Sequence, residues 1–166
     1  MNKPLVGIVM GSDSDLPVLE NTVKTLKDFG IPYEISVLSA HRAPRKVAEY
    51  AAAAAGRGLK VLIAAAGGAA HLAGAVAANT ILPIIGIPIN ATDLNGLDSL
   101  LATVQMPPGV PVATVAIGKF GAINAGVLAA QILALGDASL REKLMQHKAG
   151  MARRVEDANA KLKPRE

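Results

Sequence analysis

Five short runs of apolar and β-branched residues recur along the chain, and most of them show no alternation with polar residues. A strand that is buried on both faces has this pattern, which is typical of a parallel sheet covered by helices. The runs predict strands at 5–10, 33–38, 61–66, 84–89 and 112–117.

Helical patterns separate these runs. Apolar residues at three- to four-residue spacing predict a helix over 15–29, and further helices are expected over 44–55 (ended by Gly56), 69–79 and 121–135. The strand–helix alternation predicts an α/β fold of three layers, with a five-stranded parallel sheet between helices. Ligands of such sheets bind at the carboxyl ends of the strands, so the loops that follow the strands are the candidate site.

A last, long helix is predicted over 139–162. Its apolar stripe is interrupted at His147, which we expect on the helix surface, and no strand follows. The helix can therefore pack on its own sheet or on a neighbouring subunit. Residues 1–166 are expected to form a single α/β domain, since domains usually have about 100–200 residues and the sequence shows no repeat or linker.

The composition narrows the functional classes. The chain is 51% hydrophobic and 18% charged, which suits a packed core, and it has no cysteine for disulfide or thiolate chemistry. The absence of cysteine suits a reducing compartment, and we expect a cytoplasmic protein. The net charge of +4 comes largely from basic residues after position 140, among them Lys163 and Arg165. No stacking aromatics accompany these charges, so a solvated helix face is favoured over nucleic-acid binding.

No membrane association is expected. The longest nearly apolar stretch, 61–78, is broken by Gly67, Gly68 and His71. It therefore lacks the uninterrupted run of about 18 residues that a membrane span needs. The start of the chain, residues 1–4, leads directly into the first predicted strand without a cleavage-type site, so no signal peptide is expected.

The loop after the first strand, residues 11–15, reads Gly-Ser-Asp-Ser-Asp. Glycine allows close backbone approach, and free amides at a helix N-terminus attract phosphate. Serine hydroxyls can donate to phosphate oxygens, and Asp15 can accept from ribose hydroxyls. Helix capping alone would explain only one of the four polar residues. The segment matches neither of the glycine-rich nucleotide motifs, which disfavours a nucleoside triphosphate or a dinucleotide.

The loop after the second strand contains Ser39, Ala40, His41 and Arg42. Histidine can give and take protons near neutral pH, and arginine can grip phosphate or carboxylate with two hydrogen bonds. The pair indicates a proton-transfer residue beside an anion site. The structural alternative is a histidine bonded to nearby backbone, with the arginine in solvent.

The loop after the third strand, residues 67–72, combines small residues with His71. Its amides could line a pocket for a planar ring, although tight packing of helix on sheet also requires small residues. His71 could contact a ligand, form a structural hydrogen bond or lie at an interface. No metal site is expected, because the sequence has no cysteine, no His-x-x-x-His spacing and no acidic cluster beside either loop histidine.

Four segments, at 11–15, 39–42, 67–72 and 98–107, resemble in order and spacing the class I N5-carboxyaminoimidazole ribonucleotide mutases. This is the family of the bacterial phosphoribosylaminoimidazole carboxylase catalytic subunit. The resemblance implies a flavodoxin-like topology, a homo-octamer with active sites at subunit junctions, and a reaction that uses neither metal nor organic cofactor. The implied reaction moves a carboxylate from the exocyclic nitrogen of an imidazole ribonucleotide to ring carbon C4.

The resemblance also implies residue roles. His41 corresponds to the general acid/base, which would protonate the carbamate nitrogen, release carbon dioxide and later remove the C4 proton. The loops and the resemblance together give the expected substrate-binding residues, which are Gly11, Ser12, Ser14, Asp15, Ser39, Arg42, Gly67, Gly68, Ala70, His71 and Leu72.

The sequence departs from the family pattern at two places. Ala73 stands where the family usually has proline, and Arg45 stands where it usually has aspartate. Neither change affects His41, so the expected reaction is unchanged. The details of substrate specificity are left open. Rival hypotheses are a carboxylase that takes free carbon dioxide and a non-catalytic nucleotide-binding module. A response regulator would need an aspartate where Ala66 ends the third strand, and a flavodoxin would need aromatics beside a flavin.

Overall fold

The computed structural model describes residues 3–162 of the chain. The first two residues of the start considered above, and Lys163 and Arg165 of the basic tail, lie outside the described residues.

Five parallel strands form one sheet in the order β2-β1-β3-β4-β5. The predicted three-layer α/β fold is confirmed, with its five-stranded parallel sheet. The last strand is much shorter than the predicted range 112–117. The strands are β1 (Val6–Met10), β2 (Tyr33–Val37), β3 (Val61–Gly67), β4 (Ile84–Ile89) and β5 (Ala113–Thr114).

The helices follow the predicted alternation, with shifted ends. They are η1 (Asp13–Asp15, a 3₁₀ turn), α1 (Leu16–Phe29), α2 (Pro44–Arg57), α3 (Leu72–Ala77), α4 (Leu97–Val104), α5 (Gly118–Leu133) and α6 (Ala138–Ala160). Helix α2 runs past Gly56 and ends at Arg57, where it is capped by Gly58, whose φ of 101° suits glycine. Helix α3 is shorter than the predicted 69–79, and helix α4 had no residue range in the sequence prediction.

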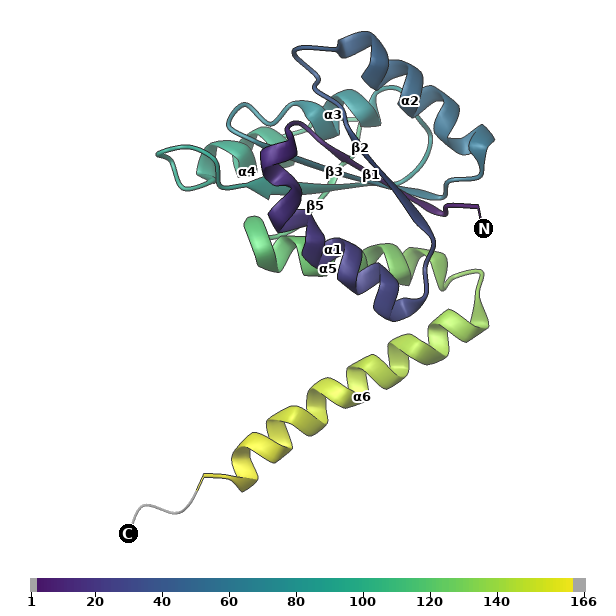
Figure 1. The fold of residues 1–166 in the computed structure, drawn as a ribbon, viewed down its shortest axis with the longest axis vertical. Coiled ribbons are helices and arrows are strands. Elements are labelled where there is room, and N and C mark those ends of the chain that lie inside the picture. The colour runs from purple at the N-terminus through teal and green to yellow at the C-terminus, as the bar shows by residue number, and fades with distance from the viewer. Residues whose placement is uncertain (1–2, 163–166) are drawn as a thin grey trace.

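Helices cover both faces of the sheet (Figure 1). Helices α1 and α5 pack on one face, and α2, α3 and α4 lie on the other. Small residues on α5 let it approach α1 closely, because a Cβ at Gly126 would lie 2.7 Å from Cβ of Thr25. In the same contact the Thr22 hydroxyl donates to the Ala122 carbonyl over 2.8 Å. A core without tryptophan is thus filled by close approach of its elements.

Strand register brings the loops of the candidate site together. Met10 at the end of β1 pairs with Val37 of β2 on one side and with Ala65 of β3 on the other. Because the three strands are parallel and adjacent, the loops that follow them begin at the same edge of the sheet.

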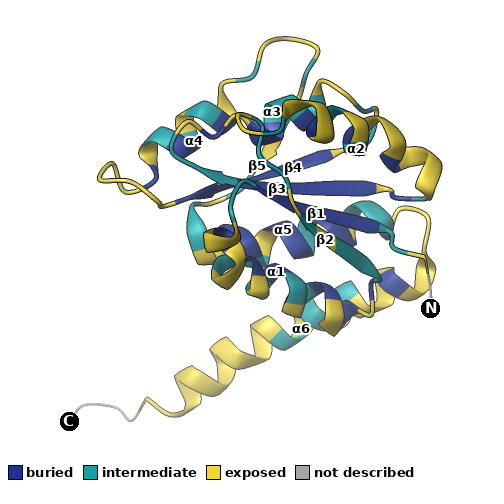
Figure 2. Cartoon of the chain, turned by 45° about the horizontal axis from the view of Figure 1, so that its top comes forward, coloured by how far each residue is buried: buried dark blue, intermediate teal, exposed yellow. Residues whose placement is uncertain are grey.

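Helix α6 runs away from the body of the chain (Figures 1 and 2). Among its described residues only Leu140 is buried. The Asp137 carboxylate caps its start by accepting from the amides of Ser139 and Leu140. His147 is partly exposed on α6, which does not contradict its predicted surface position, and its ring packs against α1, with its centroid 5.4 Å from that of Phe29. No helix in residues 3–162 is both long enough and apolar enough to cross a membrane.

Candidate active site

A cavity of about 450 Å³ opens at the carboxyl edge of the sheet. It lies where the loops after β1, β2 and β3 meet, with one residue from the loop after β4. Its lining residues are Gly11, Ser12, Ser14, Asp15, Ser39, Ala40, His41, Arg42, Ala66, Gly67, Ala69, His71, Leu72 and Ala91. Ten of the twelve site residues expected from sequence are in this set.

The other two expected residues, Gly68 and Ala70, are outside the lining set. Gly68 turns the loop with a φ of 59°, a left-handed conformation that favours glycine. Ala70 is buried in the protein. Both therefore shape the loop behind the cavity wall.

Four lining residues were not among the expected site residues, although Ala40 and Ala69 belong to the loops singled out in the sequence. Ala40, Ala66, Ala69 and Ala91 are alanines without a functional group that would single them out as site residues. Ala91 enters because the loop after β4 approaches β3 closely. A Cβ at Gly67 would lie 2.5 Å from Cβ of Ala91.

The loop at 11–15 is organised by its own side chains. Ser12 and Asp15 form a capping box, in which the Ser14 amide donates to the Ser12 hydroxyl and the Ser12 amide donates to Asp15. The hydroxyls of Ser12 and Ser14 are 2.9 Å apart, and the Asp13 carboxylate accepts from the Ser14 amide. The capping box thus uses the side chains of two residues, Ser12 and Asp15, where the sequence analysis expected capping to explain one. The Ser14 hydroxyl is bonded to the Ser12 hydroxyl and takes no part in it.

Asp15 is the buried carboxyl group of the cavity, with 5% of its surface exposed. Burial raises the pKa of its carboxyl group above the ordinary value of 3.8. The hydrogen bond from the Ser12 amide opposes this shift, and the negative charge of Asp13 adds to it. Asp15 is therefore held as a hydrogen-bonding group in a poorly hydrated place.

Arg42 joins two of the loops. Its Nη2 donates to the Gly11 carbonyl over 3.0 Å, and its Nε donates to the Ser39 hydroxyl over 3.3 Å. The Arg42 amide also donates to that hydroxyl. A fixed positive charge thus sits between the loop at 11–15 and His41, where an anion bound by the first loop would lie within its reach.

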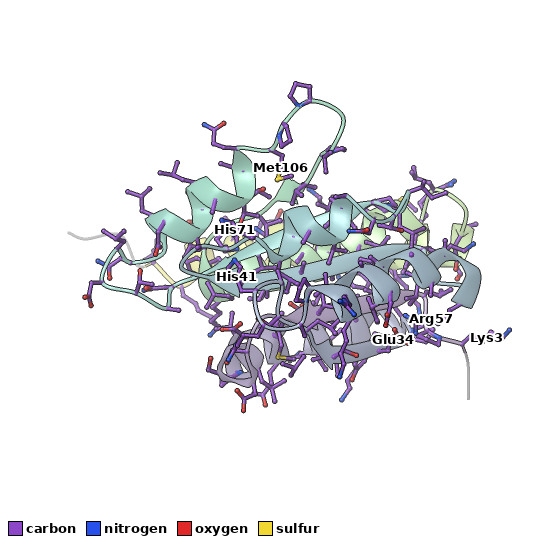
Figure 3. The ribbon with its side chains drawn as sticks, turned by 90° about the horizontal axis from the view of Figure 1, so that it is seen from above. Lys3, Glu34, His41, Arg57, His71 and Met106 are labelled. Carbon is purple, nitrogen blue, oxygen red and sulfur yellow. The ribbon has the colours of Figure 1, made fainter. Side chains whose placement is uncertain are left out.

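His41 and His71 meet at the same edge of the sheet. Nε2 of His41 lies 2.7 Å from Nδ1 of His71, with the rings nearly perpendicular at 84°. Figure 3 shows His41 and His71 close together and well separated from Glu34 and Arg57. In residues 3–162 neither ring forms a salt bridge with a carboxylate, and no group of three or more His, Cys, Asp and Glu side chains could hold a metal ion.

A comparison with protein-family profiles shows which family the chain belongs to. The profile of the AIR carboxylase family matches residues 5–154. The chain belongs to the AIR carboxylase family.

Several AIR carboxylase relatives are similar over nearly the whole chain. The N5-carboxyaminoimidazole ribonucleotide mutase of Pyrococcus horikoshii is 54% identical over 160 residues, which cover 96% of this chain and 89% of the relative. The Bacillus subtilis protein of the same name is 52% identical, with 96% and 99% covered. The phosphoribosylaminoimidazole carboxylase of Saccharomyces cerevisiae is 55% identical, but the match covers 88% of this chain and 25% of the relative.

Solved structures agree with the family assignment. Treponema denticola PurE superposes with a TM-score of 0.84 at 31% identity, covering 96% of this chain and 99% of that one. These comparisons confirm the predicted membership and the flavodoxin-like α/β fold. The AIR carboxylase fold thus places the resemblance motifs at 11–15, 39–42 and 67–72 around one cavity.

Proposed function

We propose that the chain is an isomerase of purine biosynthesis that converts N5-carboxyaminoimidazole ribonucleotide into 4-carboxy-5-aminoimidazole ribonucleotide. One observation carries the proposal. A single cavity is lined by a histidine, an arginine and a serine-rich loop, side chains that can exchange protons and bind a phosphate, and relatives that share more than half of the aligned residues are named as this mutase.

The polar side of the cavity suits the ribose phosphate. Ser12 and Ser14 present hydroxyls, and Arg42 presents a guanidinium whose position is fixed by Gly11 and Ser39. Arginine binds phosphate with directed, charge-assisted hydrogen bonds. Asp15 can accept from a ribose hydroxyl while its own carboxyl group stays buried.

His41 performs both proton transfers. It first donates a proton to the exocyclic nitrogen as the bond from that nitrogen to the carboxylate carbon breaks and carbon dioxide forms. Carbon C4 then attacks the carbon dioxide, and His41 takes the proton that C4 bore. The number of protons on the enzyme is the same before and after, as an isomerisation requires.

The apolar side of the cavity suits the step in which carbon dioxide is free. Ala40, Ala66, Ala69 and Leu72 face the same space as His41. An apolar wall excludes water, which limits escape of the intermediate before C4 attacks it. The roles of these residues, and of the substrate-binding set given above, are part of the proposal, with His71 acting through its contact with His41 and not through contact with the substrate.

The second candidate is a carboxylase that adds free carbon dioxide to aminoimidazole ribonucleotide. The yeast relative named as a carboxylase favours this candidate, but three quarters of its length lie outside the match. An assay of the purified protein with each ribonucleotide, with and without bicarbonate, separates the possibilities. The mutase converts the N5-carboxylated substrate without bicarbonate, the carboxylase requires bicarbonate, and a binding module makes no product.

We also propose a cytoplasmic homo-octamer, with α6 packed on a neighbouring copy. Helix α4 supports an assembly because its exposed face is apolar, with Leu97, Leu101 and Val104 at 54%, 50% and 48% exposure. Its buried face carries Ser99 and Thr103 instead. A helix with this inverted pattern gains from burial against another copy. A cysteine-free sequence supports the cytoplasmic location.

A further inference from the structure

The contact between His41 and His71 restricts where protons can lie. Two ring nitrogens 2.7 Å apart share one hydrogen bond, so one nitrogen carries the proton and the other is bare. A neutral histidine has one protonated nitrogen, and the bond made by one nitrogen sets the state of the other. The His71 ring therefore bears directly on which atom of His41 is free to exchange a proton.

The acid form of His41 decides the direction of this bond. As an imidazolium, His41 carries protons on both nitrogens, so its Nε2 must donate. The Nδ1 of His71 must then be bare and must accept, with the His71 proton on Nε2. The opposite direction would set two N–H donors against each other at 2.7 Å, with no acceptor between them.

We propose that His71 is a positioning residue that keeps the proton on Nε2 of His41, so that Nδ1 of His41 alone gives and takes the migrating proton. This inference rests on the proposed function. The proton on Nδ1 leaves for the exocyclic nitrogen, and the proton from C4 returns to the same Nδ1. The Nε2 proton stays in its hydrogen bond to His71 throughout, so one atom serves both ends of the reaction.

The backbone holds His71 in place for this role. Its amide donates to the Ala69 carbonyl over 2.8 Å, and its carbonyl accepts from the Ala75 amide over 2.9 Å in the first turn of α3. Enzymes commonly orient a histidine base with a third group, often a carboxylate. Here the charged groups of the cavity are Arg42, which is bonded to Gly11 and Ser39, and Asp15, which is bonded to Ser12. An imidazole therefore occupies the place of the orienting carboxylate.

Two substitutions at His71 distinguish a role in orienting His41 from a structural role in the loop at 67–72. His71→Leu removes the acceptor, and His71→Gln restores one as an amide oxygen. We expect kcat of the Leu variant to fall by about 10–100-fold, as for loss of other orienting partners, with KM little changed. The Gln variant should recover most of this loss. A raised KM in the Leu variant without recovery by Gln would show a merely structural role and would overturn the proposal.

A second readout does not depend on turnover. Long-range ¹H–¹⁵N spectra of ¹⁵N-histidine-labelled protein report which ring nitrogen is protonated, and the chain has only three histidines to assign. We expect neutral His41 to be the Nε2–H form in the unaltered protein and a mixture of both forms in His71→Leu. An Nδ1–H form in the unaltered protein would overturn the proposal. This spectrum tests the inference even if the unaltered enzyme fails to isomerise the substrate, an outcome that would refute the proposed function separately.

Discussion

The guanidinium of Arg42, in the loop after β2, donates to the carbonyl of Gly11, in the loop after β1, over 3.0 Å. This bond crosses between the two loops that supply the polar side of the cavity. Ser39 holds the same side chain at Nε, so the guanidinium is bonded on two sides. The cavity thus carries an ordered positive charge, which reduces the entropy lost when an anion binds.

Replacement of Arg42 tests its binding role. Arg42→Ala should raise KM by about 10–100-fold, since a hydrogen bond to a charged group contributes roughly 1.5–3 kcal/mol. Lys46→Ala is the matched control, because it removes a positive charge from exposed α2 surface outside the cavity lining. Steady-state kinetics with both variants check this, and an unchanged KM in Arg42→Ala would contradict the assigned role.

Replacement of His41 tests the proton transfers. His41→Asn keeps a polar side chain of similar size but cannot exchange protons near neutral pH. We expect kcat to fall by at least about 10²–10⁴-fold, the usual contribution of a general acid or base, while the protein folds normally. Single-turnover kinetics with circular dichroism as the folding control measure this. Turnover near that of the unaltered enzyme would remove His41 from the mechanism.

Replacement by alanine is expected to have opposite effects on stability at two glycines, Gly67 and Gly56. A Cβ at Gly67 would lie 2.5 Å from Cβ of Ala91 and 3.2 Å from the Ile89 carbonyl, so Gly67→Ala must push the loop after β4 outward. Overpacking of this kind costs about 1–3 kcal/mol, and the opened cavity should also lower kcat. Gly56 lies inside α2 with open space around it, so Gly56→Ala should stabilise the protein by up to about 1 kcal/mol. The free energy of unfolding of both variants is measured by urea unfolding. If both substitutions change it in the same direction, this account is contradicted.

The burial of Asp15 predicts a pH-dependent difference in stability. The folded state raises the pKa of its carboxyl group above 3.8, so the folded chain holds that proton more tightly than the unfolded chain does. This stabilises the folded state at low pH, and the benefit is lost as the pH rises through the folded pKa. Asp15→Asn carries no such titration and can still accept from the Ser12 amide. The free energy of unfolding of Asp15→Asn, relative to that of the unaltered protein, should therefore increase as the pH rises from below 3.8. Urea unfolding at several pH values measures this difference. A difference that shrinks with rising pH would contradict the effect of burial.

The inverted face of α4 predicts an effect on assembly. Leu101 lies in the middle of the exposed apolar face of α4, and half of its surface is accessible. Leu101→Glu therefore places a charge in the middle of that face. We expect light scattering to report smaller particles than for the unaltered protein, with far-UV circular dichroism unchanged. Ser99 is fully buried and bonded to the carbonyls of Ile89 and Gly96, so the variant leaves the inner face intact. A particle mass equal to that of the unaltered protein would remove α4 from the interface.

The sheet could be predicted from sequence where its strands are buried on both faces. Strand β4 matches its predicted range of 84–89, and every residue in it is buried. Helix α4 could not be located, because its buried residues include Ser99 and its exposed residues include Leu101, the reverse of an ordinary amphipathic pattern. The predicted strand 112–117 is reduced to Ala113–Thr114, since only those two residues pair with β4.

The candidate site was predictable in its chemistry but not in its contacts. His41 and Arg42 stand out because few residue types exchange protons or grip anions, and the parallel sheet puts their loop at the ligand edge. The hydrogen bond between His41 and His71 joins residues 30 positions apart. It depends on the placement of β1 between β2 and β3 and on loop conformations that the sequence pattern does not specify. The apolar wall residues, such as Ala91, carry no signal until the fold brings them together.

The transfer of a labelled carboxylate tests the central claim most directly. The purified enzyme is given N5-carboxyaminoimidazole ribonucleotide with ¹³C in the carbamate carboxylate, in buffer that contains unlabelled bicarbonate. We predict that the 4-carboxy product retains most of the label, because the carbon dioxide released beside His41 stays in the cavity until C4 attacks it. A product that carries the isotope composition of the bicarbonate, or no product at all, would contradict intramolecular carboxylate transfer.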